Sequence, residues 1–198
     1  MRYHRSDIVE RAVGILDQYG LADLSMRRIA SELGLQPSAL YHHFANKQAL
    51  LAAVADELLE RGSRPEAPGK WDERVVAQSR ELRDAMLAYR DGAELIATVH
   101  AFGLGVDAPL GRLAASIREA GFDEAFAGAA ASTILHFVFG HVSDEQTHLQ
   151  ANSVGAIDHP VDRADSDSFE LGLTLILDGI RQRAERAHQE AWTGRPSS

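Results

Sequence analysis

Apolar residues recur along most of the chain at the three- and four-residue spacing of helices. Near the N-terminus, Ile8, Ala12, Ile15, Leu16 and Tyr19 fall on one helical face. No segment shows sustained alternation of apolar and polar residues between turn residues, which is the pattern of a half-buried strand. The pattern therefore predicts an all-α fold without a sheet.

Two short helices joined by a tight turn are predicted next. Ser25 is a good N-cap for the first, and Ile29, Ala30 and Leu33 follow on one apolar face. Gly34 ends this helix, because glycine tolerates the positive φ that a sharp turn requires. The chain is therefore expected to reverse direction just after residue 34.

The second short helix is predicted to open at Pro37, a position that needs no amide donor. Leu40 and Phe44, four residues apart, anchor it inward. The residues left facing outward are Ser38, Ala39, Tyr41 and His42. Such a face suits the major groove of DNA better than a protein core.

Longer helices are predicted in the remaining chain. They are predicted at residues 46–61, over Trp71–Tyr89, from about Asp91, from about Val106 to Ala120, from a cap at Asp123 to about Glu145, and over about Ser168–Ala191. The Gly/Pro-rich residues 62–69 mark a hinge or domain boundary. Residues 149–167 are polar and acidic, which predicts a mobile loop, and disorder is expected at residues 193–198.

The segment from Ser25 to Lys47 resembles the DNA-binding half of the TetR (tetracycline-repressor) family of bacterial regulators. The family pattern of a capped helix, a glycine turn and Leu-Tyr-x-His-Phe followed by Asn-Lys stands here as residues 40–44 and 46–47. A helix-turn-helix alone is a weak signal, since unrelated proteins carry one. The match that begins in the preceding amphipathic helix is stronger.

The resemblance continues into the C-terminal half. Residues 87–93 (Leu-Ala-Tyr-Arg-Asp-Gly-Ala) resemble a segment of the tetracycline repressors themselves, and residues 119–122 and 136–140 keep the same register. This implies an N-terminal three-helix DNA-binding domain and a C-terminal helical ligand-binding and dimerisation domain. The expected parts are 1–47 for DNA binding, 48–61 for the connecting helix, 62–70 for the hinge, 71–192 for the C-terminal domain and 193–198 for the tail.

The resemblance also implies a set of DNA-contacting residues. They are Arg27, Arg28, Pro37, Ser38, Ala39, Tyr41, His42, His43 and Lys47. Arg27 matches a base-reading arginine, and a bidentate guanidinium fits the O6/N7 edge of guanine. His43 and Lys47 match phosphate-contacting positions, which set register without reading sequence. Arg28 suits either base reading or phosphate contact, and the remaining residues would contact base edges or brace the helix. Each residue taken singly is also compatible with a solvated surface position.

Two predicted helices near the C-terminus carry apolar residues on more than one face. These residues are Ile134, Leu135, Phe137, Val138 and Phe139 in one helix and Phe169, Leu171, Leu173, Leu175, Ile176, Leu177 and Ile180 in the other. A helix that is apolar all round is buried on more than one side. Core packing explains some of them, and a four-helix interface between two subunits, as in the family, explains the surplus. A homodimer would place two recognition helices roughly 34–36 Å apart on a palindromic operator.

The expected ligand pocket departs from the tetracycline pattern. The family's metal-coordinating histidine falls on Ile96, a drug-contacting histidine on Ser63 and a drug-contacting glutamine on Leu113. The acidic residue that lies behind the direct metal ligands in the family is roughly kept as Asp144. Loss of the imidazole removes the direct protein ligand to magnesium. A more apolar effector than tetracycline–magnesium is therefore expected. The pocket candidates, each also compatible with a core role, are Ile96, His100, Phe102, Leu113, Ile117, His136 and Phe137.

Composition and charge narrow the class further. The chain has 198 residues and no cysteine, which excludes disulfides and cysteine zinc sites. Its net charge of −9 argues against a nucleic-acid partner, but the distribution of charge matters more than the total. Cationic and histidine side chains gather near the N-terminus at Arg2, His4, Arg5, Arg27, Arg28, His42, His43 and Lys47. We expect no membrane span and no signal peptide, hence a cytoplasmic protein.

One further cluster offers an alternative chemistry. His141, Asp144, Glu145 and His148 recur at helical spacing and would suit a metal, although a polar helix end is the simpler interpretation. No nucleophile elbow, phosphate loop or zinc-protease motif is present, so we expect no enzyme, no bound metal and no cofactor. The sequence predicts a ligand-responsive repressor released from DNA by a small molecule. An activator or nucleoid-associated DNA binder of the same fold is the open alternative, and a metal-dependent enzyme is a third.

Overall fold

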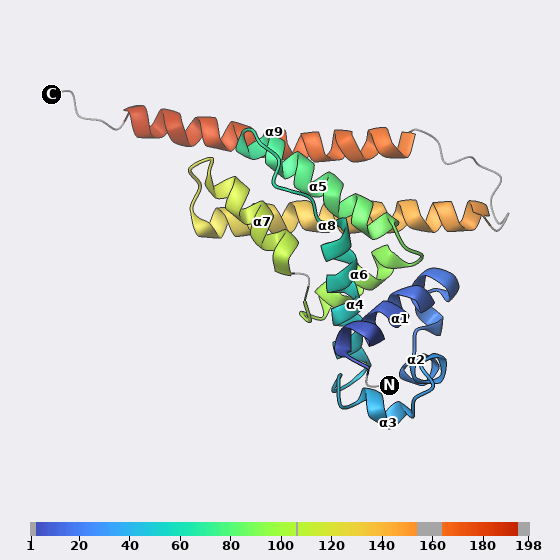
Figure 1. The fold of residues 1–198 in the computed structure, drawn as a ribbon. Helices are drawn as coiled ribbons and strands as arrows, with labels where there is room; N and C mark the ends of the chain where they lie inside the picture. The colour runs from blue at the N-terminus through green and yellow to red at the C-terminus, as the bar shows by residue number, and fades with distance from the viewer. Residues whose placement is uncertain (1–2, 106, 154–163, 194–198) are drawn as a thin grey trace. The chain divides into compact units, whose positions relative to one another are not determined.

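The computed structural model describes residues 3–105, 107–153 and 164–193, and every regular element within these ranges is helical (Figure 1). The elements are α1 (Arg5–Tyr19), η1 (Leu21–Asp23), α2 (Met26–Glu32), α3 (Pro37–Leu40), α4 (Lys47–Gly62), α5 (Trp71–Leu87), α6 (Gly92–Ala101), α7 (Asp107–Arg118), α8 (Glu124–Ser153) and α9 (Ala164–Thr193). The all-α prediction is confirmed. The short 3-10 helix η1 was not predicted.

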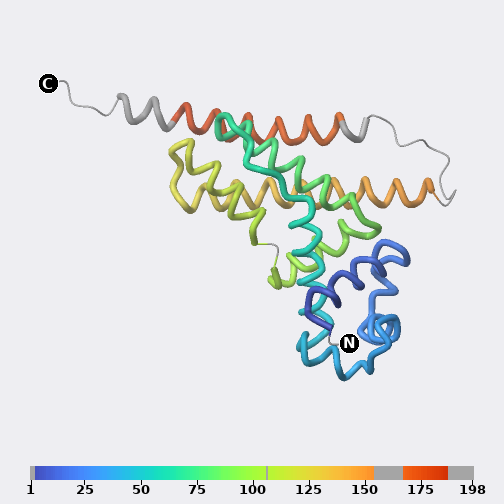
Figure 2. The backbone as a smooth tube through the Cα atoms, viewed as in Figure 1, coloured from blue at the N-terminus to red at the C-terminus, as the bar shows by residue number. Residues whose placement is uncertain are grey.

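The chain divides into two compact units, which can be followed along the tube in Figure 2. Unit 1 comprises residues 1–65, 81–107 and 142–146, and unit 2 comprises residues 66–80, 108–141 and 147–198. Helices α5 and α8 therefore contribute residues to both units. The DNA-binding motif expected from the sequence lies wholly in unit 1.

Unit 1 is built around α1 and α4. α1 packs against α2 and α4, and α4 packs in turn against α6. The apolar residues predicted to share one face of α1 fill the core here, since Ile8, Ile15 and Leu16 are at most 1% exposed. Deep burial of these side chains supplies the main driving force for folding this unit. The short helices α2 and α3 are thereby held on a stable support.

Aromatic packing between α8 and α9 stabilises unit 2. The Phe137 ring of α8 stacks on Phe169 of α9 with their centroids 5.6 Å apart. A Cβ at Gly172 would lie 2.5 Å from the edge of the Phe137 ring, so α9 needs glycine there. The pKa of Asp72 on α5 is raised by burial but lowered more by hydrogen bonds, mainly from Arg181 of α9, and lies below its ordinary value. These contacts tie α5, α8 and α9 into one unit.

The helix boundaries correct the sequence prediction at the C-terminal end. α8 was expected to end near Glu145 and instead runs to Ser153. The prediction of a loop over residues 149–167 is therefore wrong for residues 149–153 and 164–167, which are helical, while residues 154–163 lie outside the described residues. α9 ends at Thr193, so the prediction of a disordered tail is wrong at that residue. Residues 194–198 lie outside the described residues. Sequence polarity alone did not reveal that the helices continue past their apolar stretches.

The length of α8 bears on the expectation of no membrane span. By length and composition alone, this helix is apolar enough to cross a bilayer. Several of its apolar side chains, among them Ile134, Leu135 and Val138, are fully buried in the protein. A buried core helix meets the same criterion, so the observation is weak evidence for a membrane.

Candidate nucleic-acid interface

The helix-turn-helix motif forms with the local features that its sequence predicted. The Ser25 hydroxyl caps α2 by accepting from the Arg28 backbone N–H at 3.2 Å. Gly34 has φ 66° in the turn, and Pro37 occupies the first turn of α3. Leu40 and Phe44 are 0% and 1% exposed. The anchoring of α3 is therefore confirmed, and its opposite face is left free of the core.

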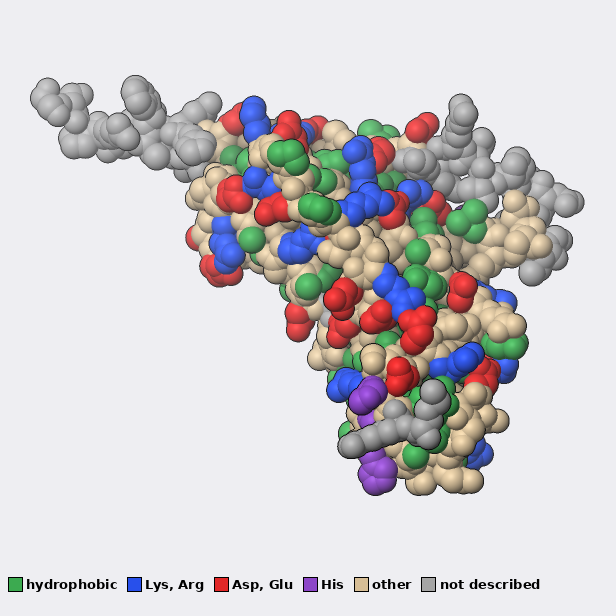
Figure 3. Space-filling view, viewed as in Figure 1, with side chains coloured by type: hydrophobic (Ala, Val, Ile, Leu, Met, Phe, Trp, Pro, Cys, Tyr) green, Lys and Arg blue, Asp and Glu red, His purple; other side chains and the backbone are tan. Residues whose placement is uncertain are grey.

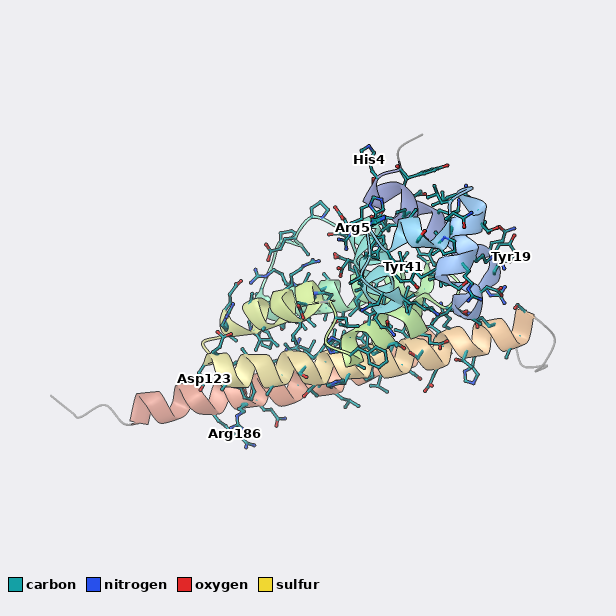
Figure 4. The ribbon with its side chains drawn as sticks, turned by 90° about the horizontal axis from the view of Figure 1, so that it is seen from below. His4, Arg5, Tyr19, Tyr41, Asp123 and Arg186 are labelled. Carbon is teal, nitrogen blue, oxygen red and sulfur yellow. The ribbon has the colours of Figure 1, made fainter. Side chains whose placement is uncertain are left out.

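The second helix of the motif is shorter than predicted. α3 ends at Leu40, and residues 41–43 continue as turns rather than as α-helix. Tyr41 is 54% exposed and lies on the side of unit 1 seen in Figure 4, while His42 and His43 are exposed beside it. Histidine side chains also mark this end of unit 1 in Figure 3. The outward-facing residues thus form a polar and aromatic surface.

The two adjacent arginines of α2 differ in their surroundings. Arg27 is exposed and makes no ion pair with any other described residue. The Arg28 guanidinium lies 3.7 Å above the Tyr19 ring and donates to Asp23 Oδ1 at 2.7 Å. Desolvation lowers the pKa of Arg28, but its hydrogen bond to Glu32 and the charge of Asp23 raise it, so the pKa lies above its ordinary value. Arg27 is available to a ligand, whereas Arg28 joins α1, η1 and α2.

Replacing Arg28 with alanine is expected to weaken the motif without changing what it reads. Loss of the contacts with Tyr19 and Asp23 should lower the thermal unfolding midpoint and reduce binding to every DNA duplex alike. The ratio of affinities for operator and random duplex should stay that of the wild type. Unfolding by circular dichroism and binding by fluorescence anisotropy test this, and a collapse of the ratio would make Arg28 a base reader.

The nine expected DNA-contacting residues all lie within residues 27–47 of unit 1. Arg27, Ser38, Tyr41, His42, His43 and Lys47 are exposed, and Arg28, Pro37 and Ala39 are half-buried. Lys47 begins α4, where the Asn46 side chain caps the helix by accepting from the Ala49 N–H at 2.8 Å. Arg5 places its guanidinium 4.6 Å from the Phe44 ring centroid, a contact that the sequence did not predict. Cationic groups therefore flank the exposed face of α3.

The expected effector-binding residues are distributed over both units. Ile96 is buried, His100 is half-buried and Phe102 is 62% exposed, all in unit 1. In unit 2, Leu113 and Ile117 are buried, Phe137 is half-buried against Phe169, and His136 is exposed. An open pocket of about 280 Å³ in unit 1 contains none of them. It is lined by Leu58, Arg61, Gly62, Ser63, Arg64, Asp84, Ala85, Ala88 and Tyr89.

The acidic and histidine cluster of α8 is not arranged as a metal site. Among the described residues, no group of three or more histidine, aspartate and glutamate side chains is placed to hold a metal ion. Glu145 is 7% exposed and pairs with Arg83, whose Nε donates to Oε2 at 2.8 Å. The His141 ring lies 5.7 Å from Phe137 and 5.4 Å from Phe169. Glu145 and His141 therefore have structural partners that explain their positions.

A capped helix-turn-helix with an exposed cationic and aromatic face defines a DNA-binding protein. Residues 8–54 match the family of bacterial regulatory proteins called tetR, and residues 64–165 match the tetracyclin repressor-like C-terminal domain. The chain belongs to the TetR family. It is a ligand-responsive DNA-binding transcriptional regulator, and the members of this family are regulators rather than enzymes.

Known proteins resemble the chain over most of its length. The tetracycline repressor protein class A from transposon 1721 of Escherichia coli is 35% identical over 198 residues, which cover 89% of each chain. The crystal structure of BioQ from Mycobacterium smegmatis is 42% identical and has a TM-score of 0.83, covering 90% of this chain and 98% of that one. A crystal structure of a protein named BioQ with its double-stranded DNA operator is 40% identical and has a TM-score of 0.75, covering 90% of this chain and 98% of that one.

Proposed function

We propose that the chain is a repressor whose operator is read by Arg27 and by the exposed face of α3. The observation that carries this assignment is the contrast between the exposed Arg27, which makes no ion pair with another described residue, and the neighbouring Arg28, which contacts Tyr19 and Asp23. A free guanidinium at the protein surface can pair bidentately with guanine. His43 and Lys47, both exposed, set the register on phosphates. The structure of BioQ with its operator supports DNA binding by this fold.

The proposed form of the regulator is a homodimer on a palindrome. Leu171 and Leu175, one turn apart on α9, are 62% and 65% exposed, although their neighbours Leu173 and Leu177 are each 1% exposed. Two large apolar side chains on one exposed face favour association with a second copy. We keep as a proposal the functional division predicted from the sequence, with residues 1–47 for DNA binding, 48–61 as connecting helix, 62–70 as hinge and 71–192 for effector binding and dimerisation. The protein would act in the cytoplasm, where its DNA lies.

The proposed effector is a small molecule more apolar than the magnesium chelate of tetracycline. Ile96 and Leu113 stand where the tetracycline pattern has a metal-binding histidine and a drug-contacting glutamine, and they are 0% and 1% exposed. Hydrocarbon side chains supply no ligand to a hard cation such as magnesium. An effector that binds the DNA-free state about a hundredfold more tightly would shift the equilibrium by about 2.7 kcal/mol. The candidate lining residues are those named from the sequence.

A promoter reporter tests repression. With an operator selected by the protein placed across the promoter, the wild type should lower expression, and Arg27→Ala should restore it to the level without regulator. Tetracycline with magnesium should leave repression in place. Expression raised by the wild type would identify an activator, and release by tetracycline would contradict the proposed effector chemistry.

A further inference from the structure

The turn between α5 and α6 contains a residue in a strained conformation. Asp91, the N-cap of α6, has φ 54° and ψ 18°, in the left-handed region that disfavours residues other than glycine. An N-cap aspartate ordinarily accepts from the first-turn N–H groups of its own helix, yet Asp91 makes no such bond. A strained residue persists when its surroundings require it. What the Asp91 carboxylate contacts therefore indicates what the turn is for.

The carboxylate reaches the corner that follows α1. Asp91 Oδ2 accepts from the backbone N–H of Leu21 at 2.8 Å, across 70 residues of sequence. Gly20, in the same corner, has φ 87°, and a Cβ there would lie 2.5 Å from Asp91 Oδ2. The contact thus depends on an acceptor at position 91 and on a glycine at position 20. An ionised acceptor makes this a strong hydrogen bond.

Gln146 of α8 holds the same turn. Its amide nitrogen donates to the carbonyls of Tyr89 at 3.0 Å and Met86 at 3.3 Å, and its amide oxygen accepts from the Ala93 N–H at 3.0 Å. The Gln146 side chain is 7% exposed, so water does not compete effectively for these bonds. A hydrogen-bonded series therefore runs, within unit 1, from α8 through the α5–α6 turn to the corner after α1.

This series gives the DNA-binding motif a second attachment. The first attachment is α4, which packs against α1 and α6. A body attached along one helix can still rotate about it, and a hydrogen bond at the far corner of α1 opposes that rotation. The Asp91 contact is placed to fix the orientation of α1, and with it that of α2 and α3.

We propose that Asp91 is a positioning residue that determines which half-site spacing the dimer accepts, through its hydrogen bond to the corner after α1. The inference rests on the proposed function, because it requires two reading motifs on a palindrome. One added base pair displaces a half-site by about 3.4 Å and turns it by roughly a tenth of a helical turn. Rigidly held motifs discriminate against that change, and loosely held motifs tolerate it.

The test compares the wild type with Asp91→Gly on three palindromes, the selected operator and versions with one base pair inserted or removed at the centre. Glycine keeps the left-handed turn and removes the acceptor. The wild type should prefer its own spacing by about tenfold or more, and Asp91→Gly should reduce this ratio to about threefold or less. The matched control is Asp84→Ala, which removes an exposed carboxylate of α5 that pairs with Arg64.

Three results separate the possible failures. A wild type that prefers no palindrome overturns the proposed function and this inference with it. An unchanged spacing ratio in folded, dimeric Asp91→Gly overturns the inference alone, as does an equal loss of discrimination in Asp84→Ala. If Asp91→Gly does not fold, Asp91→Asn decides, because asparagine tolerates the left-handed conformation and replaces the carboxylate with a neutral, weaker acceptor; it too must relax the spacing preference.

Discussion

Arg27→Ala is expected to abolish operator selectivity while the protein remains a folded dimer. Each bidentate contact between arginine and guanine contributes about 1–3 kcal/mol of discrimination, so a dimer would lose about 2–6 kcal/mol. Affinity for random duplex should change little, because phosphate contacts supply non-specific binding. Fluorescence anisotropy with operator and random duplexes at one salt concentration measures the ratio.

Two further variants accompany the Arg27 experiment, one as a control and one as a second test of the reading face. Arg11→Ala removes an arginine of α1 that pairs with Glu32 at 3.5 Å and should keep the selectivity. Tyr41→Ala should lose it, because Tyr41 lies on the exposed face beyond α3. Unchanged sequence preference in both Arg27→Ala and Tyr41→Ala would contradict the assignment of the reading face.

The double substitution Leu171→Glu and Leu175→Glu is expected to produce a folded monomer. Both side chains are exposed in the single chain, so charges there should spare its core while repelling a second copy. A monomer has one reading motif, so operator affinity should fall by about 10³-fold or more toward non-specific binding. Light scattering gives the mass, and anisotropy gives the affinity.

Leu104→Glu is the matched control for the dimer experiment, because Leu104 is an exposed leucine, at 41%, that lies outside α9. It should remain dimeric. A double variant that still has the mass of a dimer would contradict the proposed interface and direct attention to another face of the protein.

The local structure of the DNA-binding motif could be predicted because its signals are local. The Ser25 cap, the positive φ of Gly34 and the inward anchors Leu40 and Phe44 each depend on neighbours within a few residues. The shortness of α3 escaped prediction, since helical spacing continues through residues 41–44 although the hydrogen-bonding pattern changes to turns.

Contacts between distant residues could not be predicted from spacing. The contacts of Arg28 with the Tyr19 ring and with Asp23 of the unpredicted η1 depend on the fold, so residue spacing did not reveal them. The bond from Leu21 to Asp91 joins segments 70 residues apart. Pocket candidates posed a related difficulty, because a buried Ile96 produces the same apolar periodicity whether it lines a cavity or fills a core.

Selection of DNA from random duplex by the purified protein, at physiological salt, tests the central claim most directly. We predict enrichment of one palindrome by the wild type and loss of that enrichment in Arg27→Ala. Such a result would establish a dimeric, sequence-specific regulator and supply the operator for effector screening. A folded dimer that enriches no sequence would contradict the account, because the helix-turn-helix would then not read DNA.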